Sequence, residues 1–450
     1  MPHAASVVIS LFAVSAASGG HDPLPSRDAV HAAIHNGAAA AAASLQPASE
    51  AEGGGLVAKC DYHLLRGEWY DYERLWHTGQ TIRALVSASE VLNNSSLAAT
   101  AMEAGRWWKS QRIQTPPGLA GLMNSTDVLP SWVGCITDAC NGTQDLGDVS
   151  DSAYGIFALT AATGDLSFAD AASASALWQL QHMGVAGRPG LYWNILNKSA
   201  DPPAPLKDIS QPFRTQIEGS LFLQAFRHTG NLRLRNGFIE QAEATVAYQD
   251  EHGLWMLWTP NDNSTGTLHL RYNLWYAHSL VDAYDLTQNE TYLTAAARTA
   301  VFYVSTVQRS DGTMYYETNV DGSAIENDIC GSAVGFLLHL VLRLLRSRAI
   351  VAHQPSATLT ALRLSVTRSV AWLLSNQYPP DHADPSLAGA FLELDFRHKA
   401  TYLGPHSRAV IHRDLGTSFA LPALGAYDAF CRTVSDAASR TLCGAGYTAL

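Results

Sequence analysis

Residues 147 to 165 read GDVSDSAYGIFALTAATGD and carry the clearest structural signal in the chain. Acidic residues come first, and apolar residues then recur every three to four positions from Ala153 to Thr160, as on one face of a helix. Gly164 ends the pattern, as glycine commonly does at a helix C-terminus. The stretch therefore predicts a helix that begins among acids and is followed directly by a second helix.

The same pattern recurs twice downstream. Residues 217 to 231 read IEGSLFLQAFRHTGN and again close in Thr-Gly before a small polar residue, about 66 residues after the first copy. A third copy covers residues 273 to 289 and closes in TQN. Asp151 and Glu218 occupy comparable places in the first two copies. Helix pairs at near-constant spacing indicate an array of helical hairpins.

The composition fits a folded globular protein and excludes some classes of partner. The chain has 450 residues, of which 47% are hydrophobic and 15% charged, which provides ample material for a core. The net charge is −11, and no dense run of Lys or Arg is present to neutralise a phosphate backbone. We therefore expect no nucleic-acid partner.

The N-terminus predicts secretion. Residues 1–18 contain an apolar core from Ala4 to Ala17, with Ser15 and Ala17 at the spacing that a signal peptidase recognises. We expect a signal peptide over 1–18, a single domain over 24–450 and an extracellular protein. Seven Asn-x-Ser/Thr sequons agree with glycosylation, at Asn93, Asn94, Asn124, Asn141, Asn197, Asn263 and Asn289.

The cysteines suit an oxidising compartment, because their number, six, is even. Cys135 and Cys140 are close enough to bridge one loop. The remaining pairs are open, and one of the fifteen possible connectivities joins Cys431 to Cys443 and Cys60 to Cys330. No CxxC pair or nucleotide-binding fingerprint is present, so we predict neither a metal nor another cofactor.

The hydrophobic periodicity predicts an all-α fold. If the first predicted helix packs beside the last, the chain closes into a single-domain (α/α)6 toroid of six hairpins. Residues 332–343 are apolar nearly all round but too short to cross a bilayer, which indicates an inner helix and no membrane span. Residues 113–147 form a long loop rich in Pro and Gly. Helices or hairpins are predicted at 26–45, 73–92, 97–112, 151–182, 214–250, 272–308, 327–376 and 409–430.

Aromatic residues follow a glycine in three of the predicted loops, at 190–193, 253–258 and 312–316. We expect these loops to open at one end of the ring, around the acids. Flat rings cover the apolar faces of sugars, and carboxyl groups act on glycosidic bonds, so the pattern favours a saccharide substrate. The alternative is that these aromatic side chains fill the core.

The chain resembles the six-hairpin glycosidases, and among them the unsaturated glucuronyl and rhamnogalacturonyl hydrolases, over roughly residues 70 to 345. Trp76-His77-Thr78-Gly79 is similar to the family's Trp-Thr-x-Gly, and residues 271–275 (RYNLW) to its Arg-Gly-Asn-Gly-Trp. Asp328 precedes small residues as at the start of the family's fifth inner helix. The resemblance implies catalytic roles for Asp151 and Glu218. The candidates for substrate contact are Trp76, Asp148, Trp193, Trp255, His269, Arg271, Asn273, Trp275, Tyr315 and Asp328.

The departures from the family bear on the reaction. The family's second acid is Asp where this chain has Glu218, and the glycines that flank Asn273 have become Tyr272 and Leu274. The resemblance implies that a carboxyl group protonates the double bond of an unsaturated uronyl residue and then directs water to the cation. A neighbouring acid such as Asp148 favours the protonated form, whereas a helix N-terminus favours the anion, so the sequence leaves the protonated acid open.

Each candidate residue also has a structural alternative. Asp151 could cap a helix, and Glu218 could pair with Arg214 on a helix surface. Arg271 suits a uronate carboxylate, but it and its neighbours could equally begin a helix. The histidines are expected to be structural, with His269 the exception, and the five considered are His77, His228, His269, His339 and His412.

Three other functions remain open. A polysaccharide lyase would need a Tyr or His base, for which Tyr272 and His269 are available. An α-mannan-directed glycosidase of the same fold would show two adjacent Asp residues on one loop, which we do not find. The third alternative is a saccharide-binding protein without activity. Among these, the residues favour a secreted hydrolase of uronic-acid-containing oligosaccharides.

Overall fold

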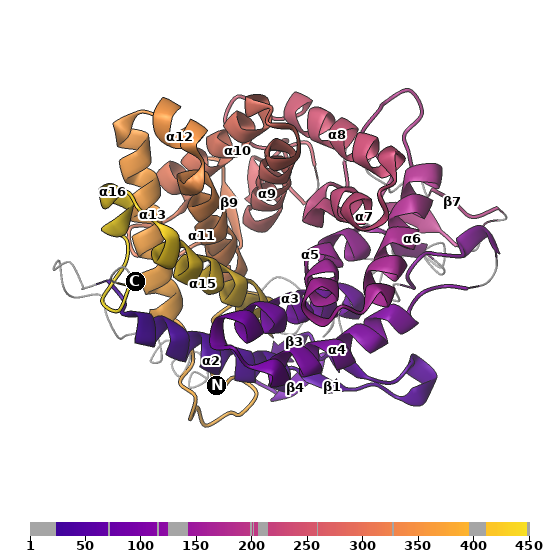
Figure 1. The fold of residues 1–450 in the computed structure, drawn as a ribbon, viewed down its shortest axis with the longest axis horizontal. Coiled ribbons are helices and arrows are strands. Elements are labelled where there is room, and N and C mark those ends of the chain that lie inside the picture. The colour runs from indigo at the N-terminus through magenta and orange to yellow at the C-terminus, as the bar shows by residue number, and fades with distance from the viewer. Residues whose placement is uncertain are drawn as a thin grey trace.

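The computed structural model describes residues 24–70, 73–114, 117–124, 143–198, 200, 202–205, 215–258, 260–325, 328–395 and 411–447. Within these ranges the helices surround a common centre (Figure 1). The predictions for the signal peptide, the Cys135–Cys140 bridge, the sequon at Asn141 and the pairing with Arg214 fall outside the described residues.

Long helices alternate along the chain between an inner and an outer ring. The inner helices are α3 (Arg74–Leu92), α5 (Gly147–Thr163), α7 (Leu221–Thr229), α9 (Leu270–Thr287), α11 (Gly331–Arg346) and α15 (Leu415–Thr433). The outer helices are α2 (Arg27–Ala43), α4 (Ser95–Ser110), α6 (Leu166–His182), α8 (Leu232–Ala247), α10 (Glu290–Phe302) and α13 (Ser356–Ser375). Two short helices, α12 (Arg348–His353) and α16 (Ala437–Arg440), complete this set.

The ring closes between the two ends of the chain. The inner helices α3 and α5 pack together, as do α11 and α15, and α15 also packs against α3. The first described helix, α2, contacts both α15 and α3, so it completes the hairpin that contains the last inner helix. Figure 1 shows this junction, where the indigo and yellow segments lie side by side. The predicted all-α toroid of six hairpins is confirmed.

The helix ends follow the predicted signals. Gly164 and Gly230 end α5 and α7 with φ of 73° and 71°, the left-handed backbone that glycine accepts without a steric cost. Asp165 and Asn231 then cap α6 and α8, because each side chain accepts a hydrogen bond from the backbone two residues on. The Thr-Gly-polar sequence is thus the turn of these two helical hairpins.

Burial accounts for the apolar character of α11. Nearly every residue from Gly331 to Leu345 is buried, which identifies the predicted inner helix. Within the described residues, no helix is both long and apolar enough to cross a membrane.

Two glycines allow α3 and α5 to pack closely. A Cβ atom placed on Gly155 would lie 2.1 Å from the carbonyl oxygen of Gly79, and one on Gly79 would lie 2.4 Å from the Cβ of Ser152. Real Cβ atoms do not approach so closely, so only glycine permits this helix contact. The final residue of the Trp76–Gly79 motif therefore has a packing role.

The glycines before the aromatic runs contact the next outer helix. Gly190, Gly253 and Gly312 have φ of 77°, 87° and 92°. A Cβ atom on any of them would come within 3.0 Å of helix backbone in the next hairpin, at Glu240 of α8, Arg298 of α10 and Arg368 of α13 respectively. Each glycine therefore joins neighbouring hairpins, and the recurrence reflects the six-fold architecture.

Short antiparallel strands, which the sequence analysis did not predict, lie in the connections between helices. A four-stranded sheet has the order β10-β11-β3-β4 and brings the start of the chain beside its end. Its strands are β3 (Asp61–His63), β4 (Glu68–Tyr70), β10 (Leu394–Asp395) and β11 (Ile411–Arg413). The other sheets contain β1 (Leu45–Pro47), β2 (Leu56–Ala58), β5 (Thr143–Asp145), β6 (Ile195–Asn197), β7 (Ala204–Pro205), β8 (Thr267–His269) and β9 (Glu317–Asn319).

A disulfide joins Cys431 of α15 to Cys443, one of the considered pairings. The pairing of Cys60 with Cys330 is wrong. Both side chains are buried thiols, and their sulfurs form hydrogen-bond contacts with the carbonyl oxygen of Ala58 and the hydroxyl of Ser332 respectively.

Candidate active site

Two of the predicted acids lie in the first two turns of α5, which begins at Gly147. Asp148 is 5% exposed and Asp151 is 4% exposed. Asp151 does not cap the helix, because Leu146 occupies the N-cap position and Asp151 lies inside the helix. Its carbonyl oxygen accepts a hydrogen bond from the Gln80 amide of α3, which fixes this turn of α5 against the neighbouring inner helix.

Glu218 begins a short 3₁₀ turn, η4 (Glu218–Ser220), that leads into α7. Its side chain is fully buried. The turn touches α5, because a Cβ atom on Gly219 would lie only 1.9 Å from the carbonyl oxygen of Ser150. Asp151 directly follows Ser150, and Glu218 directly precedes Gly219. The structure therefore brings the two acids onto touching turns, buried from bulk water.

A buried ion-pair cluster, which we define as Arg271, Glu393, Tyr316, Arg413 and Asp61, connects α9 with the four-stranded sheet. The Nη1 atom of Arg271 lies 3.3 Å from Oε1 of Glu393, and Nε of Arg413 lies 3.1 Å from Oδ1 of Asp61. Both guanidinium groups also donate to the Tyr316 hydroxyl, each over 2.6 Å. All five residues are at most 1% exposed, so the cluster is part of the protein interior.

His77 extends this network to the start of α15. Its Nδ1 atom lies 2.5 Å from Oδ1 of Asp414, and its Nε2 atom lies 3.2 Å from Nη2 of Arg413. An arginine can only donate, so Nε2 of His77 accepts the hydrogen bond from Arg413. The proton of the neutral ring is therefore on Nδ1, which donates a hydrogen bond to Asp414. His77 is therefore a structural histidine, as expected, that joins α3 to α15.

The electrostatics of the cluster are those of buried, paired charges. Burial raises the pKa of Glu393 and of Asp61, and the arginines beside them oppose this rise. Burial alone would lower the pKa of Arg271, but Tyr316 and Glu393 raise it above its ordinary value. The charge of Arg271 is thus already balanced inside the protein. This packing does not fit the prediction that Arg271 binds a uronate carboxylate directly.

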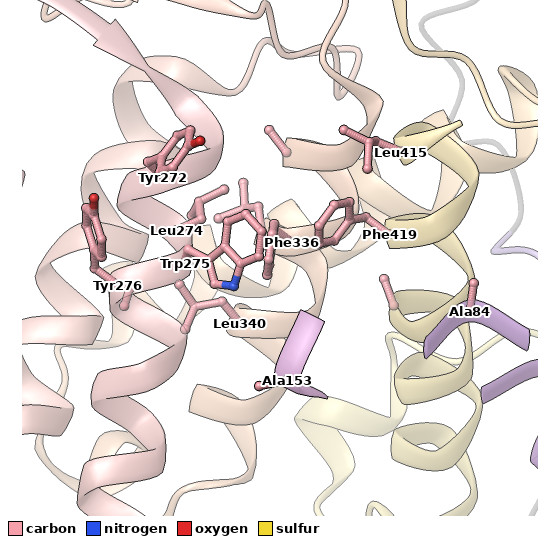
Figure 2. Close-up of a cluster of buried hydrophobic side chains, with 14 of the residues drawn as sticks. Ala84, Ala153, Tyr272, Leu274, Trp275, Tyr276, Phe336, Leu340, Leu415 and Phe419 are labelled. Atoms are coloured by element: carbon pink, nitrogen blue, oxygen red, sulfur yellow. The ribbon is translucent and has the colours of Figure 1, made fainter. Parts of the chain in front are cut away.

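Two tryptophans of the predicted site form an aromatic layer beneath these polar groups. The Trp76 ring lies 5.9 Å from Trp275, and the guanidinium of Arg271 lies over it at 5.1 Å. Trp275 in turn contacts Phe336 at 5.2 Å and Phe419 at 5.7 Å. Figure 2 shows the indole of Trp275 facing Phe336, with Phe419 beyond it. This layer joins α3, α9, α11 and α15 at the centre of the toroid.

Two predicted contacts on the α9 side have structural roles. Asn273 is fully buried, and its Oδ1 atom accepts the backbone N–H of Trp255 over 2.8 Å. Trp255 is itself fully buried, and its indole donates to the carbonyl of Thr245 over 2.7 Å. Asn273 therefore holds the loop after α8, and Trp255 fills the core instead of presenting a face to a sugar. The alternative of a core-filling aromatic holds for Trp255.

His269 lies just before α9 and is 2% exposed. Its ring meets the edges of Tyr272 at 5.0 Å and Tyr316 at 4.8 Å. The structure thus places His269 and Tyr272, the two residues considered as lyase bases, in contact with each other and with the ion-pair cluster.

The other predicted contacts differ in exposure. Trp193 and Tyr315 are partly exposed. Arg309 lies over the Tyr315 ring at 5.5 Å. Asp328 is 1% exposed and precedes Ile329, which pairs with Leu394 of β10.

Sequence reasoning missed the acids and the arginine from the last third of the chain. Glu393 and Asp395 alternate with Leu392 and Leu394. Such alternation predicts a strand with one charged face, and here that face is buried through pairing. The missed signal was therefore the alternation at 392–395. Arg413 was instead placed in the helix predicted at 409–430, which in the structure begins only at Leu415, after β11.

Within the parts of the chain that the structure describes, no three His, Cys, Asp or Glu side chains are grouped to hold a metal ion.

Searches for similar proteins gave matches at the level of structure. The unsaturated glucuronyl hydrolase from Bacillus sp. GL1 is 13% identical, with a TM-score of 0.59 over 88% of this chain and 96% of that one. Other unsaturated glucuronyl hydrolases match with TM-scores of 0.58 and 0.59. The fold is that of these hydrolases. No family model and no curated protein matches the sequence.

The same fold occurs in enzymes of other classes. A cellobiose 2-epimerase from Bacillus thermoamylovorans is 12% identical, with a TM-score of 0.56 over 83% of this chain and 92% of that one. A type II terpene cyclase from Scytonema, also 12% identical, has a TM-score of 0.52 over 90% and 98% of the two chains. Because one fold supports these different reactions, the function must be argued from the site.

Two buried histidines should make the fold sensitive to acid. Burial lowers the pKa of His278 to about 3, and Arg343 adds to this effect, while burial lowers the pKa of His412 to about 4. The unfolded chain binds these protons near pH 6.5. The neutral histidines therefore contribute stability that is complete above pH 6.5 and is lost as the pH falls toward 3.

We expect the free energy of unfolding to fall with decreasing pH by up to about 1.4 kcal/mol per unit for each histidine. Urea titrations from pH 7 to pH 4 measure this slope. His278→Gln should reduce it, whereas His353→Gln, at an exposed position, should not. An unchanged slope in His278→Gln would contradict this account of His278.

Proposed function

We propose that this protein is a secreted glycoside hydrolase that acts on uronic-acid-containing oligosaccharides by hydrating an unsaturated uronyl residue at the non-reducing end. One observation carries the proposal: Asp151 and Glu218 are buried on touching turns of neighbouring inner hairpins. The fold shared with unsaturated glucuronyl hydrolases, and the motif resemblance of the first, second and fourth hairpins, support it.

The proposed reaction adds one water molecule across a carbon–carbon double bond. A carboxyl group, which we assign to Asp151, donates its proton to one carbon of the double bond, and positive charge develops at the other carbon and the ring oxygen. The carboxylate then takes a proton from water as the water oxygen bonds to that second carbon. The resulting hemiketal opens and releases the rest of the saccharide, and the acid returns to its starting form.

Glu218 is proposed to assist Asp151 by orienting the water. A general base must lie within hydrogen-bond reach of the proton that it receives, or reach it through one water. Two carboxyl groups on touching turns can divide acid and base work in this way. The longer side chain of Glu218, compared with the family's Asp, extends the acid by one methylene group and is expected to alter which saccharides fit.

A panel of purified oligosaccharides tests the proposed function. Unsaturated uronyl disaccharides should be cleaved, and their saturated counterparts should not. Equal cleavage of both would indicate ordinary glycosidic hydrolysis. New unsaturated ends generated from a polymer would indicate a lyase, with His269 or Tyr272 as the base. Binding without cleavage of any saccharide would indicate a binding protein.

Secretion is part of the proposal and has its own support. The sequons at Asn93, Asn263 and Asn289 place asparagines at exposed positions, as glycosylation requires. Expression in a eukaryotic host should yield a protein in the medium that lacks residues 1–18 and loses mass on deglycosylation. Retention in the cells with an intact N-terminus would contradict secretion.

A further inference from the structure

The backbone around Glu218 has an unusual conformation. Gln216, Gly219 and Ser220 have φ of 53°, 65° and 51°, so three of five consecutive residues are left-handed. For a residue with a side chain, this conformation costs about 1 kcal/mol or more. Such a turn persists only where the surrounding structure holds it, and Glu218 is held within it.

A buried carboxylate at the centre of the toroid supports this turn. The hydroxyl of Ser220 donates to Oδ2 of Asp282 over 2.6 Å, and the hydroxyl of Tyr154 donates to the same oxygen over 2.5 Å. The other oxygen, Oδ1, pairs with Arg343 over 2.8 Å. Asp282 is 7% exposed, and it connects η4 to α5, α9 and α11.

Asp282 is ionised in this setting. Burial would raise its pKa, but Arg343 and the hydroxyls of Ser220 and Tyr154 outweigh burial, and the pKa is lowered. One oxygen of this carboxylate accepts from both Ser220 and Tyr154 while the other pairs with Arg343. In an asparagine one of these two positions would be an NH2 group, a donor that faces other donors.

The carbonyl groups of the turn are bound from the side. Ser279 of α9 donates to the carbonyl of Ile217 over 2.7 Å. Gln241 of α8 donates to the carbonyl of Thr215 over 2.5 Å and to that of Gln216 over 3.2 Å. These contacts fix the position of the chain, and the contact from Asp282 fixes the left-handed Ser220 that follows Glu218.

We propose that Asp282 is a positioning residue for the active site, holding Ser220 so that the left-handed turn presents Glu218 beside Asp151. This inference rests on the proposed function for its kinetic consequence, but its structural part stands independently. Asp282 lies in α9, outside the turn, and acts through the hydroxyl of Ser220.

Two variants separate this role from general stability. Ser220→Gly removes the hydroxyl and still accepts the left-handed backbone, so it should fold like the wild type. Asp282→Asn removes the charge. The matched control is Asp285→Asn, because Asp285 also pairs with Arg343 over 2.8 Å but is 51% exposed and makes no contact with Ser220 that the structure shows.

We expect kcat on an unsaturated uronyl disaccharide to fall about 100-fold in Ser220→Gly and Asp282→Asn, as for a misplacement of about 1 Å. KM should change little, and the acid limb of the pH profile of kcat should move. Asp285→Asn should behave like the wild type. If the wild type is active and both Ser220→Gly and Asp282→Asn keep its kcat and its pH profile, the positioning role is overturned. The proposed function would then remain intact.

Crystal structures of the same variants test the inference without any substrate. The Glu218 carboxyl should be displaced by about 1 Å relative to Asp151 in Ser220→Gly and unmoved in Asp285→Asn. A superposable Glu218 in all variants would overturn the inference. If the wild type is inactive on the disaccharide but Glu218 is displaced in Ser220→Gly, the proposed function alone is refuted.

Discussion

Asp151→Asn is expected to lower turnover of unsaturated uronyl oligosaccharides by about 10²–10⁴-fold, the usual contribution of a general acid–base group. Asparagine has nearly the same shape as aspartate but cannot donate and recover the catalytic proton. Because the two side chains have nearly the same shape and Asp151 does not cap α5, the fold should be unaffected. Steady-state kinetics with circular dichroism as a check on folding measure both effects.

The matched control for this variant is Asp165→Asn in the same hairpin. Asp165 is exposed and caps α6 by accepting the backbone N–H of Ser167 over 3.0 Å. Asparagine caps helices as well as aspartate does, so both activity and stability should be retained. Full turnover in Asp151→Asn would remove Asp151 from its catalytic role. In that event Glu218→Gln shows whether the second acid acts alone.

Trp275→Ala is expected to destabilise the protein by about 3–5 kcal/mol, the range for replacing a buried Trp or Phe by alanine. The indole is fully buried among Trp76, Tyr272, Phe336 and Phe419, so its removal leaves a cavity where four inner helices meet (Figure 2). Urea denaturation with a two-state fit measures this loss.

Trp193→Ala is the comparison for this prediction, since Trp193 is partly exposed in the loop after α6. We expect a smaller loss of stability there. A free energy of unfolding in Trp275→Ala within about 1 kcal/mol of the wild type would show that the aromatic layer is not a central support of the toroid.

The helical part of this fold could be predicted because its signals are local. A glycine at the end of one helix and a capping Asp or Asn at the start of the next define each turn, as at Gly164–Asp165 and Gly230–Asn231. These signals depend on backbone geometry and hydrogen bonds between near neighbours. The prediction that the ring closes depended on one assumption, that the first predicted helix packs beside the last.

The short strands and the ion-pair cluster could not be predicted in the same way. Asp61 and Arg413 lie 352 residues apart and meet only through the pairing of β3 with β11. The three residues of β3 and the three of β11 are too few to show a period. In the sequence, the charged residues of this cluster look the same as charged residues on a protein surface. They can be buried only because each has a partner of opposite charge or a hydrogen-bond partner.

The glycine-aromatic runs show how one pattern supports two interpretations. Their recurrence predicted loops that share one end of the ring, but the glycines contact the next outer helix and Trp255 fills the core. A six-fold architecture repeats its packing contacts as regularly as a binding site would repeat its platforms. The two acids were identified by position in the repeat, and the structure places them on touching turns.

Ultraviolet absorbance of an unsaturated uronyl disaccharide, followed during incubation with the purified protein, tests the central claim most directly. Hydration removes the conjugated double bond, so we predict that the absorbance falls with wild-type protein and stays constant with Asp151→Asn. A constant absorbance with the wild type across the panel of disaccharides, or a rise when intact polymer is supplied, would contradict the account.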